Sequence, residues 1–330
     1  MENFLLRPFV ISVNTIYFTI MSPVIQVNAL SKQFKSIKAV DNLSFNVNRG
    51  EVYGFLGQNG AGKSTTIRML LTLIQPTNGS IRIFGDDLLD HRNKILKQIG
   101  AIIEKPDLYK YLTALENLQL FARLSKVHRT NQQLMRQLEV VGIAERATSK
   151  VKTFSQGMKQ RLGIACALIH DPELIILDEP TNGLDPQGIA DIRNLILHLS
   201  KNENKTVVIS SHLLGEIELM ADSMLIIDKG RKIAEGKVNE LLNPADIIVE
   251  LQTTDITSAL KKLQNSSWQK GLKIADEKIL LSIHQHDIPT FAKTLIALDI
   301  DIIALQPKHS LEDYFLSLTT NSTHVATYRH

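Results

Sequence analysis

Residues 51–74 of the chain read EVYGFLGQNGAGKSTTIRMLLTLI. The apolar run at 51–56 predicts a buried strand, and a run of helical length follows the glycines. Between them, residues 57–64 fit the pattern G-x-x-x-x-G-K-[ST] without a mismatch. A strand before this loop and a helix after it are the context that the pattern requires. The stretch therefore predicts a P-loop in an α/β fold.

Such a loop binds phosphate because its glycines let consecutive backbone N–H groups point inward, at the positive end of the following helix. The loop ends with Lys63, whose charge can pair with phosphates, Ser64, whose hydroxyl can ligate Mg²⁺, and Thr65, which can reach the α-phosphate. A plain glycine turn is the alternative, and the complete pattern argues against it. The predicted nucleotide-binding residues are Gly57, Gln58, Asn59, Gly60, Ala61, Gly62, Lys63, Ser64 and Thr65. The expected ligands are ATP and Mg²⁺.

A second motif, LIILDEP at residues 174–180, is an apolar strand that ends in two carboxylates. Asp178 can hold Mg²⁺ through water, and Glu179 can polarise the water that attacks the γ-phosphate. Two solvated carboxylates at a strand end are the alternative. The phosphate loop about 115 residues upstream favours the catalytic interpretation.

The rest of the chain alternates strand-like and helix-like runs, which predicts a mainly parallel sheet with functional residues at the carboxyl ends of its strands. The 330 residues carry 37 Lys+Arg against 34 Asp+Glu, without a dense basic tract, so no nucleic-acid partner is expected. The single cysteine, Cys166, is expected to be a small core residue. Residues 1–22 are expected to be a dispensable extension or a start assigned too early, since Arg7 interrupts a short apolar run and Met21 precedes the first strand.

With these motifs in this order, residues 24–240 resemble the ATP-binding subunits of ATP-binding cassette (ABC) transporters. FSQGMKQR at 154–161 is similar to the family signature, with Ser155, Gln156 and Gly157 at the start of a helix. The resemblance implies that this helix end reaches the γ-phosphate held by an opposite subunit in a head-to-tail homodimer. Without the other motifs, an N-capped amphipathic helix would be the better interpretation.

The resemblance also implies roles for three further residues. Asp185, in NGLDP, would bridge the two subunits, although NGLDP alone is typical of an ordinary turn. His212, in ISSHLLGE, would contact the γ-phosphate and help to hold the attacking water. Phe34, in SKQFKS, would stack on adenine, with a buried core ring as the alternative.

Glu104 departs from the common family pattern, because most members carry a glutamine there. A carboxylate can still ligate the metal, and it adds negative charge beside the γ-phosphate. The surrounding sequence, IGAIIEKPDLYKYLTALENL, resembles that of the exporter ATPases that give self-protection against bacitracin and lantibiotics. A substitution without functional meaning is the alternative.

The expected organisation is an extension at 1–22, an ABC ATPase domain at 23–243 with a helical signature subdomain at about 105–165, an accessory α+β domain at 244–320 that resembles a ferredoxin-like fold, and a flexible tail at 321–330. The function implied is an ATPase that drives a separate membrane permease and exports a drug, peptide antibiotic or lipid-like compound. Its location would be cytoplasmic, at the inner face of the membrane through the permease. The alternative is a soluble ABC ATPase that acts on the ribosome or DNA.

Overall fold

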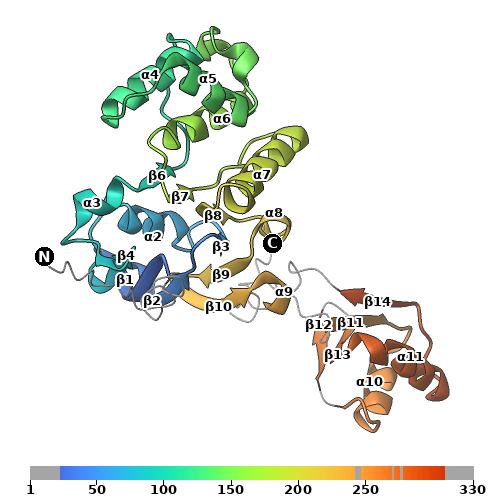
Figure 1. The fold of residues 1–330 in the computed structure, drawn as a ribbon. Coiled ribbons are helices and arrows are strands. Elements are labelled where there is room, and N and C mark those ends of the chain that lie inside the picture. Colours follow the sequence, from blue (N-terminus) through green and yellow to red (C-terminus); the bar gives the residue numbers. More distant parts are fainter. Residues whose placement is uncertain (1–22, 242–246, 270, 276–277, 309–330) are drawn as a thin grey trace, which may run out of the picture. The chain divides into compact units, whose positions relative to one another are not determined.

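The computed structural model describes residues 23–241, 247–269, 271–275 and 278–308 (Figure 1). Their contacts divide the chain after Glu235 into two compact units, a little before the expected domain boundary at 243. The expected extension at 1–22 and the expected tail at 321–330 lie outside the described residues.

The centre of the first unit is a six-stranded sheet with the order β10-β9-β3-β8-β7-β6. The pairs β6–β7, β7–β8, β8–β3 and β3–β9 are parallel, as the alternating sequence pattern predicts. Every residue of the three central strands is buried, because helices and a second sheet cover such strands on both faces. The bounds are β3 (Val52–Leu56), β6 (Ile99–Ile102), β7 (Leu174–Leu177), β8 (Thr206–Ser211), β9 (Ser223–Asp228) and β10 (Arg231–Lys237).

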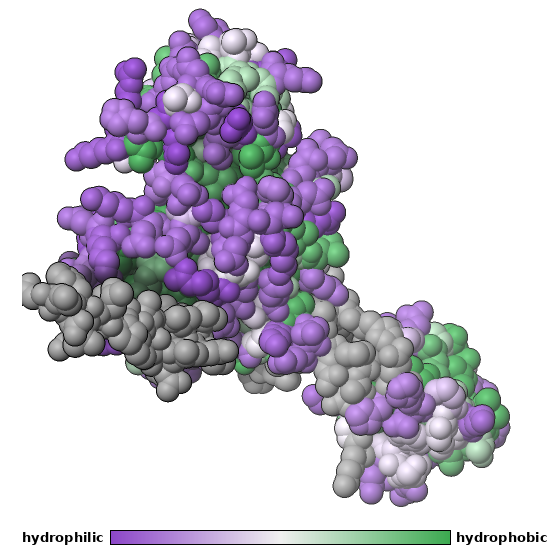
Figure 2. All heavy atoms as spheres, in the orientation of Figure 1, coloured by the Kyte–Doolittle hydropathy of each residue, from purple (hydrophilic) through white to green (hydrophobic). Residues whose placement is uncertain are grey.

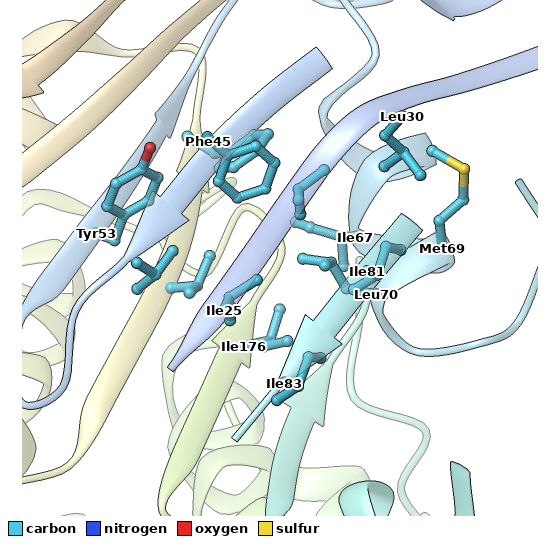
Figure 3. Close-up of a cluster of buried hydrophobic side chains, with 14 of the residues drawn as sticks. Ile25, Leu30, Phe45, Tyr53, Ile67, Met69, Leu70, Ile81, Ile83 and Ile176 are labelled. Atoms are coloured by element: carbon cyan, nitrogen blue, oxygen red, sulfur yellow. The ribbon is translucent and has the colours of Figure 1, made fainter. Parts of the chain in front are cut away.

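A separate four-stranded antiparallel sheet, with the order β2-β1-β4-β5, packs against this layer. Its strands are β1 (Ile25–Phe34), β2 (Ile37–Val47), β4 (Asn78–Ile83) and β5 (Asp86–Asp87). Strands β1 and β2 form a hairpin in which Phe34 pairs with Ile37 across a two-residue turn. Figure 3 shows how Ile25 from this sheet, Ile67 from α2 (Lys63–Leu70) and Ile176 from β7 meet in one core.

The parallel strands are joined by helices. The crossovers include α2, α3 (Arg92–Leu96), α7 (Pro186–Lys201) and α8 (Leu214–Met220), and α2 confirms the helix that the sequence predicts after the glycine loop. Each crossover returns the chain to the edge where the previous strand began. The carboxyl ends of these parallel strands therefore all lie at the same edge of the sheet. That edge brings the residues after β3, β7 and β8 together.

A group of three helices stands apart from the sheets in Figure 1. They are α4 (Ala114–Leu124), α5 (Asn131–Val140) and α6 (Gln156–Ala167), with short 3₁₀ turns η1 (Ala144–Arg146) and η2 (Val151–Thr153) between them. Thr113 and Glu116 form a capping box at α4, and the Thr113 backbone N–H and hydroxyl hold the pKa of Glu116 below its usual value. On α6, Cys166 is only 7% exposed, as predicted for a core residue. Figure 2 shows that hydrophilic residues cover most of the visible face of the first unit.

The second unit begins at Gly236, near the end of β10. Its further elements are α9 (Val238–Leu241), β11 (Ile247–Gln252), α10 (Ile256–Gln264), β12 (Leu272–Ala275), β13 (Lys278–Ile283), η3 (Gln285–Asp287), α11 (Ile288–Ala297) and β14 (Ala304–Lys308). The strand order is β12-β13-β11-β14, with antiparallel neighbours throughout. Its core includes Trp268, whose ring centroid lies 5.2 Å from that of Phe291 in an edge-on arrangement. In the described parts of the whole chain, no helix combines the length and the apolar character needed to cross a bilayer.

Candidate functional site

The glycine loop lies between β3 and α2, as the sequence predicts. Gly62 precedes the helix at φ +108°, a left-handed conformation, and a Cβ atom there would lie 2.6 Å from the Ala39 carbonyl oxygen. The position therefore requires glycine. No side chain caps α2, so its first N–H groups remain available for an anion. Residues 58–60 of the loop are exposed, while Ser64 and Thr65 are half-buried.

Lys63 is only 5% exposed, and its ammonium is held at the base of the loop. Its Nζ donates to the carbonyl oxygens of Gly57 (2.7 Å) and Gln58 (3.3 Å). It also lies 3.2 Å from Glu179 Oε1. A buried ammonium needs such partners, and here one of them is the predicted general base.

Ser210, near the end of β8, contacts both acidic residues that follow β7. Its hydroxyl donates to Asp178 Oδ1 at 2.6 Å and accepts from the Glu179 backbone N–H at 2.8 Å. Ser210 is a residue of the site that none of the sequence motifs indicates. Its place at the carboxyl end of a buried parallel strand was the available signal, because functional residues gather at that edge.

Glu179 adopts a left-handed backbone conformation, with φ +51°. Non-glycine residues rarely do so, and such strain is concentrated at functional sites. Its side chain is 16% exposed, and Oε2 lies 2.8 Å from His212 Nδ1. The structure thus brings Lys63, Glu179 and His212 together at the sheet edge, as the motif order predicts.

A cavity of about 550 Å³ opens at this edge and is lined by Ser64, Glu104, Lys105, Gln156, Gln160, Asp178, Glu179, Asn182 and Gly183. Asp178 is 1% exposed, and its Oδ2 has no hydrogen-bond partner among the described residues. A buried carboxylate oxygen without a donor fits a metal ion or its water ligand. The Ser64 hydroxyl lines the same cavity, so the residues present fit Mg²⁺.

Glu104 also lines the cavity, but its carboxylate is 65% exposed and forms an ion pair with Arg68 of α2. Its backbone is left-handed as well, with φ +60°. In this arrangement Glu104 is held by a cation on the P-loop helix.

Other predicted residues have local structural contacts in this chain. Ser155 caps α6, and its hydroxyl accepts from the Met158 N–H at 3.2 Å. Asp185 caps α7, and its Oδ1 accepts from the Gly188 N–H at 3.0 Å. A cap is compatible with a further contact, because each side chain uses one oxygen lone pair for it.

Of the two signature residues that follow Ser155, Gln156 lines the same cavity as Ser64 and Asp178, and Gly157 has open space where a Cβ atom would project. Phe34 lies at the end of β1 with 44% of its surface exposed. Lys32 Nζ stands 5.0 Å from its ring centroid. The alternative of a buried core ring at Phe34 is therefore wrong.

The profile of the family described as ABC transporter matches residues 40–182. The bacitracin transport ATP-binding protein BcrA of Bacillus licheniformis is 42% identical over 305 residues, which are 92% of this chain and 99% of that protein. The chain belongs to the ABC transporter family. It is an ATP-binding ATPase of that family, with the P-loop NTPase fold.

Three further proteins extend the comparison. The lantibiotic transport ATP-binding protein SrtF of Streptococcus pyogenes is 41% identical over 211 residues, covering 64% of this chain and 90% of that protein. A solved ATP-binding subunit of an ABC transporter matches with a TM-score of 0.59 at 34% identity, over 66% of this chain and 91% of its own. A dimeric ATP-binding cassette bound to ADP and Pi matches with a TM-score of 0.57 at 26% identity, over 65% of this chain and 98% of its own.

Proposed function

We propose that this chain is the ATP-hydrolysing subunit of an exporter and that it drives a separate membrane permease. One observation carries the proposal: the 42% identity to a bacitracin transport ATP-binding protein extends over 99% of that protein. Such a match includes the second unit as well as the ATPase unit. The proposed cargo is a drug, a peptide antibiotic or a lipid-like compound, and the proposed location is the cytoplasmic face of the membrane, through the permease.

In the proposed reaction, the loop N–H groups and Lys63 bind the ATP phosphates. A phosphate in the loop would compete with Glu179 for the Lys63 ammonium, now 3.2 Å from Glu179 Oε1. ATP binding would thus free that oxygen to accept a proton from the attacking water. His212, at 2.8 Å from the other oxygen, would fix the orientation of the carboxylate.

Ser64 and Asp178 would hold Mg²⁺, with Glu104 as a third candidate ligand. When bound, this ion neutralises charge on the transferred phosphoryl group. Phe34 is proposed to stack on adenine, and its exposed ring supports that role. Ser210 would fix the positions of the Asp178 carboxylate and the Glu179 backbone through its two hydrogen bonds.

The proposed active form is a homodimer that binds two ATP molecules head to tail. Ser155, Gln156 and Gly157 at the start of α6 would face the γ-phosphate of the partner's ATP, since a helix amino end attracts anions. Asp185 would contact the partner subunit. The dimeric cassette among the structural relatives supports this arrangement.

The proposed domain limits are 23–243 for the ATPase, with its helical subdomain at about 105–165, and 244–320 for an accessory ferredoxin-like domain. The order β-α-β-β-α-β and the antiparallel arrangement β12-β13-β11-β14 support the ferredoxin-like assignment.

The proposal is tested by producing the chain in a bacitracin-sensitive bacterium together with a candidate permease, chosen as a multi-helix membrane protein whose gene adjoins that of this chain. We expect higher resistance to bacitracin or a lantibiotic with the wild-type chain. The Glu179→Gln variant is the matched control, since it should be produced equally and give no resistance. Equal sensitivity of cells with the wild type and the control, across drugs, peptide antibiotics and lipid-like compounds, would contradict the export proposal.

A further inference from the structure

Gln160, one turn into α6, has a buried amide that the proposed reaction does not use. The residue is only 5% exposed, and its Nε2 has no hydrogen-bond partner within the described part of the chain. Burying a donor without an acceptor is unfavourable, and native structures rarely keep one without a reason. The side chain lines the same 550 Å³ cavity as Ser64 and Asp178. An acceptor that enters this cavity could therefore pair with it.

The cavity offers three carboxylates as acceptors, and two of them are already held. Asp178 Oδ1 accepts from Ser210, and its other oxygen, Oδ2, is unpartnered among the residues that the structure describes and is the one that the proposed site assigns to Mg²⁺. Glu179 has one oxygen 3.2 Å from Lys63 and the other 2.8 Å from His212. Neither carboxylate can turn toward α6 without losing these contacts.

Glu104 is the carboxylate that can move. It lies on the segment between β6 and α4, with 65% of its side chain exposed, and its partner Arg68 is 42% exposed. Exposed ion pairs contribute little free energy because water screens both charges. A hydrogen bond from a buried amide to an ionised carboxylate is stronger, because the surroundings are less polar.

We propose that Gln160 is a positioning residue for Glu104. When ATP occupies the cavity, the Glu104 carboxylate leaves Arg68, turns inward and accepts a hydrogen bond from Gln160 Nε2. The bond links α6, whose amino end carries the signature residues, to the nucleotide held by the same subunit. This inference rests on the proposed assignment of the cavity to ATP.

The test is a double-mutant cycle on MgATP affinity, measured by calorimetric titration of the purified full-length chain. Gln160→Met keeps the length of the side chain but removes the amide. We expect it to weaken MgATP binding about tenfold, the scale for losing one hydrogen bond to a charged group. In the Glu104→Ala background, the same substitution should change affinity by less than about twofold, because the acceptor is already absent.

Two outcomes overturn the proposal. An unchanged MgATP affinity in Gln160→Met would mean that water satisfies the amide. An equal loss of affinity in the wild-type and Glu104→Ala backgrounds would mean that Gln160 has a purely structural role. Arg68→Met is an independent variant on an exposed position. It should strengthen MgATP binding by about two- to fivefold, because it releases Glu104 from an exposed pair. Unchanged or weaker binding in this variant would also contradict the proposal. Failure of the wild-type chain to bind ATP would instead refute the proposed function.

Discussion

Replacing Ser210 by alanine tests whether the site is assembled by contacts between neighbouring strands. The hydroxyl donates to Asp178 at 2.6 Å and accepts from the Glu179 N–H at 2.8 Å. Ser210→Ala removes both bonds and adds no bulk. We expect the Asp178 carboxylate and the Glu179 backbone to lose their fixed positions.

The magnitude follows from the burial of the two partners. Asp178 is 1% exposed, so losing a hydrogen bond to its charge costs about 1.5–3 kcal/mol. The unpaired Glu179 N–H adds about 1 kcal/mol. The free energy of unfolding should thus fall by about 2–4 kcal/mol, which lowers Tm by roughly 5–15 °C in a unit of this size. The ATPase rate should fall by about tenfold or more, because the predicted metal ligand Asp178 and the predicted general base Glu179 both shift.

The assay compares Ser210→Ala with Ser200→Ala by thermal unfolding and by steady-state ATP hydrolysis. Ser200 is also buried, at 2% exposure, but its hydroxyl donates to the Gly50 carbonyl oxygen at 3.0 Å, away from the cavity. The control should lose only about 1 kcal/mol and keep its activity. Equal stability and equal activity in the two variants would refute the assigned role of Ser210.

Two further predictions concern Lys63 and His170. Lys63→Ala should weaken ATP binding by about 10–100-fold in calorimetric titration, because it removes the charge that pairs with the phosphates; unchanged affinity would contradict the P-loop assignment. Burial holds the pKa of His170 below 6.5, with its Nε2 donating to the Ile99 carbonyl oxygen at 3.1 Å. The unfolded chain therefore binds a proton on His170 at a higher pH than the folded chain does. The free energy of unfolding is not reduced by His170 above about pH 6.5, and it declines as the pH falls toward the folded-state pKa, by at most about 1.4 kcal/mol per pH unit. Urea unfolding at pH 5 and 7 should show a smaller loss for His170→Gln than for the wild type, and an identical loss would contradict the prediction.

The loop and the paired carboxylates could be predicted from the sequence because each is a local pattern. Gly57–Lys63 and Asp178–Glu179 follow apolar strands, and the rule for parallel sheets places such segments at one edge. The register confirms this, since Leu56 of β3 pairs with Ser211 of β8, and Leu177 of β7 pairs with Ile209 of the same strand.

Contacts between distant segments could not be predicted in the same way. Ser210 bonds to Asp178 across 32 positions, and the ion pair of Glu104 with Arg68 joins a loop to the P-loop helix. Both depend on strand register and side-chain direction, which no local pattern fixes. The capping contacts of Ser155 and Asp185 are local, and an N-capped helix at Ser155 is the alternative that the sequence itself offers.

If the cavity at the sheet edge hydrolyses ATP with Glu179 as the general base, purified Glu179→Gln should bind ATP but lose hydrolysis. The substitution keeps the size of the side chain and leaves Lys63 and the loop N–H groups in place. We expect normal ATP affinity, ATP-dependent dimers in size-exclusion chromatography, and hydrolysis slower than wild type by at least ~100-fold. Hydrolysis within a few-fold of the wild-type rate would contradict the claim.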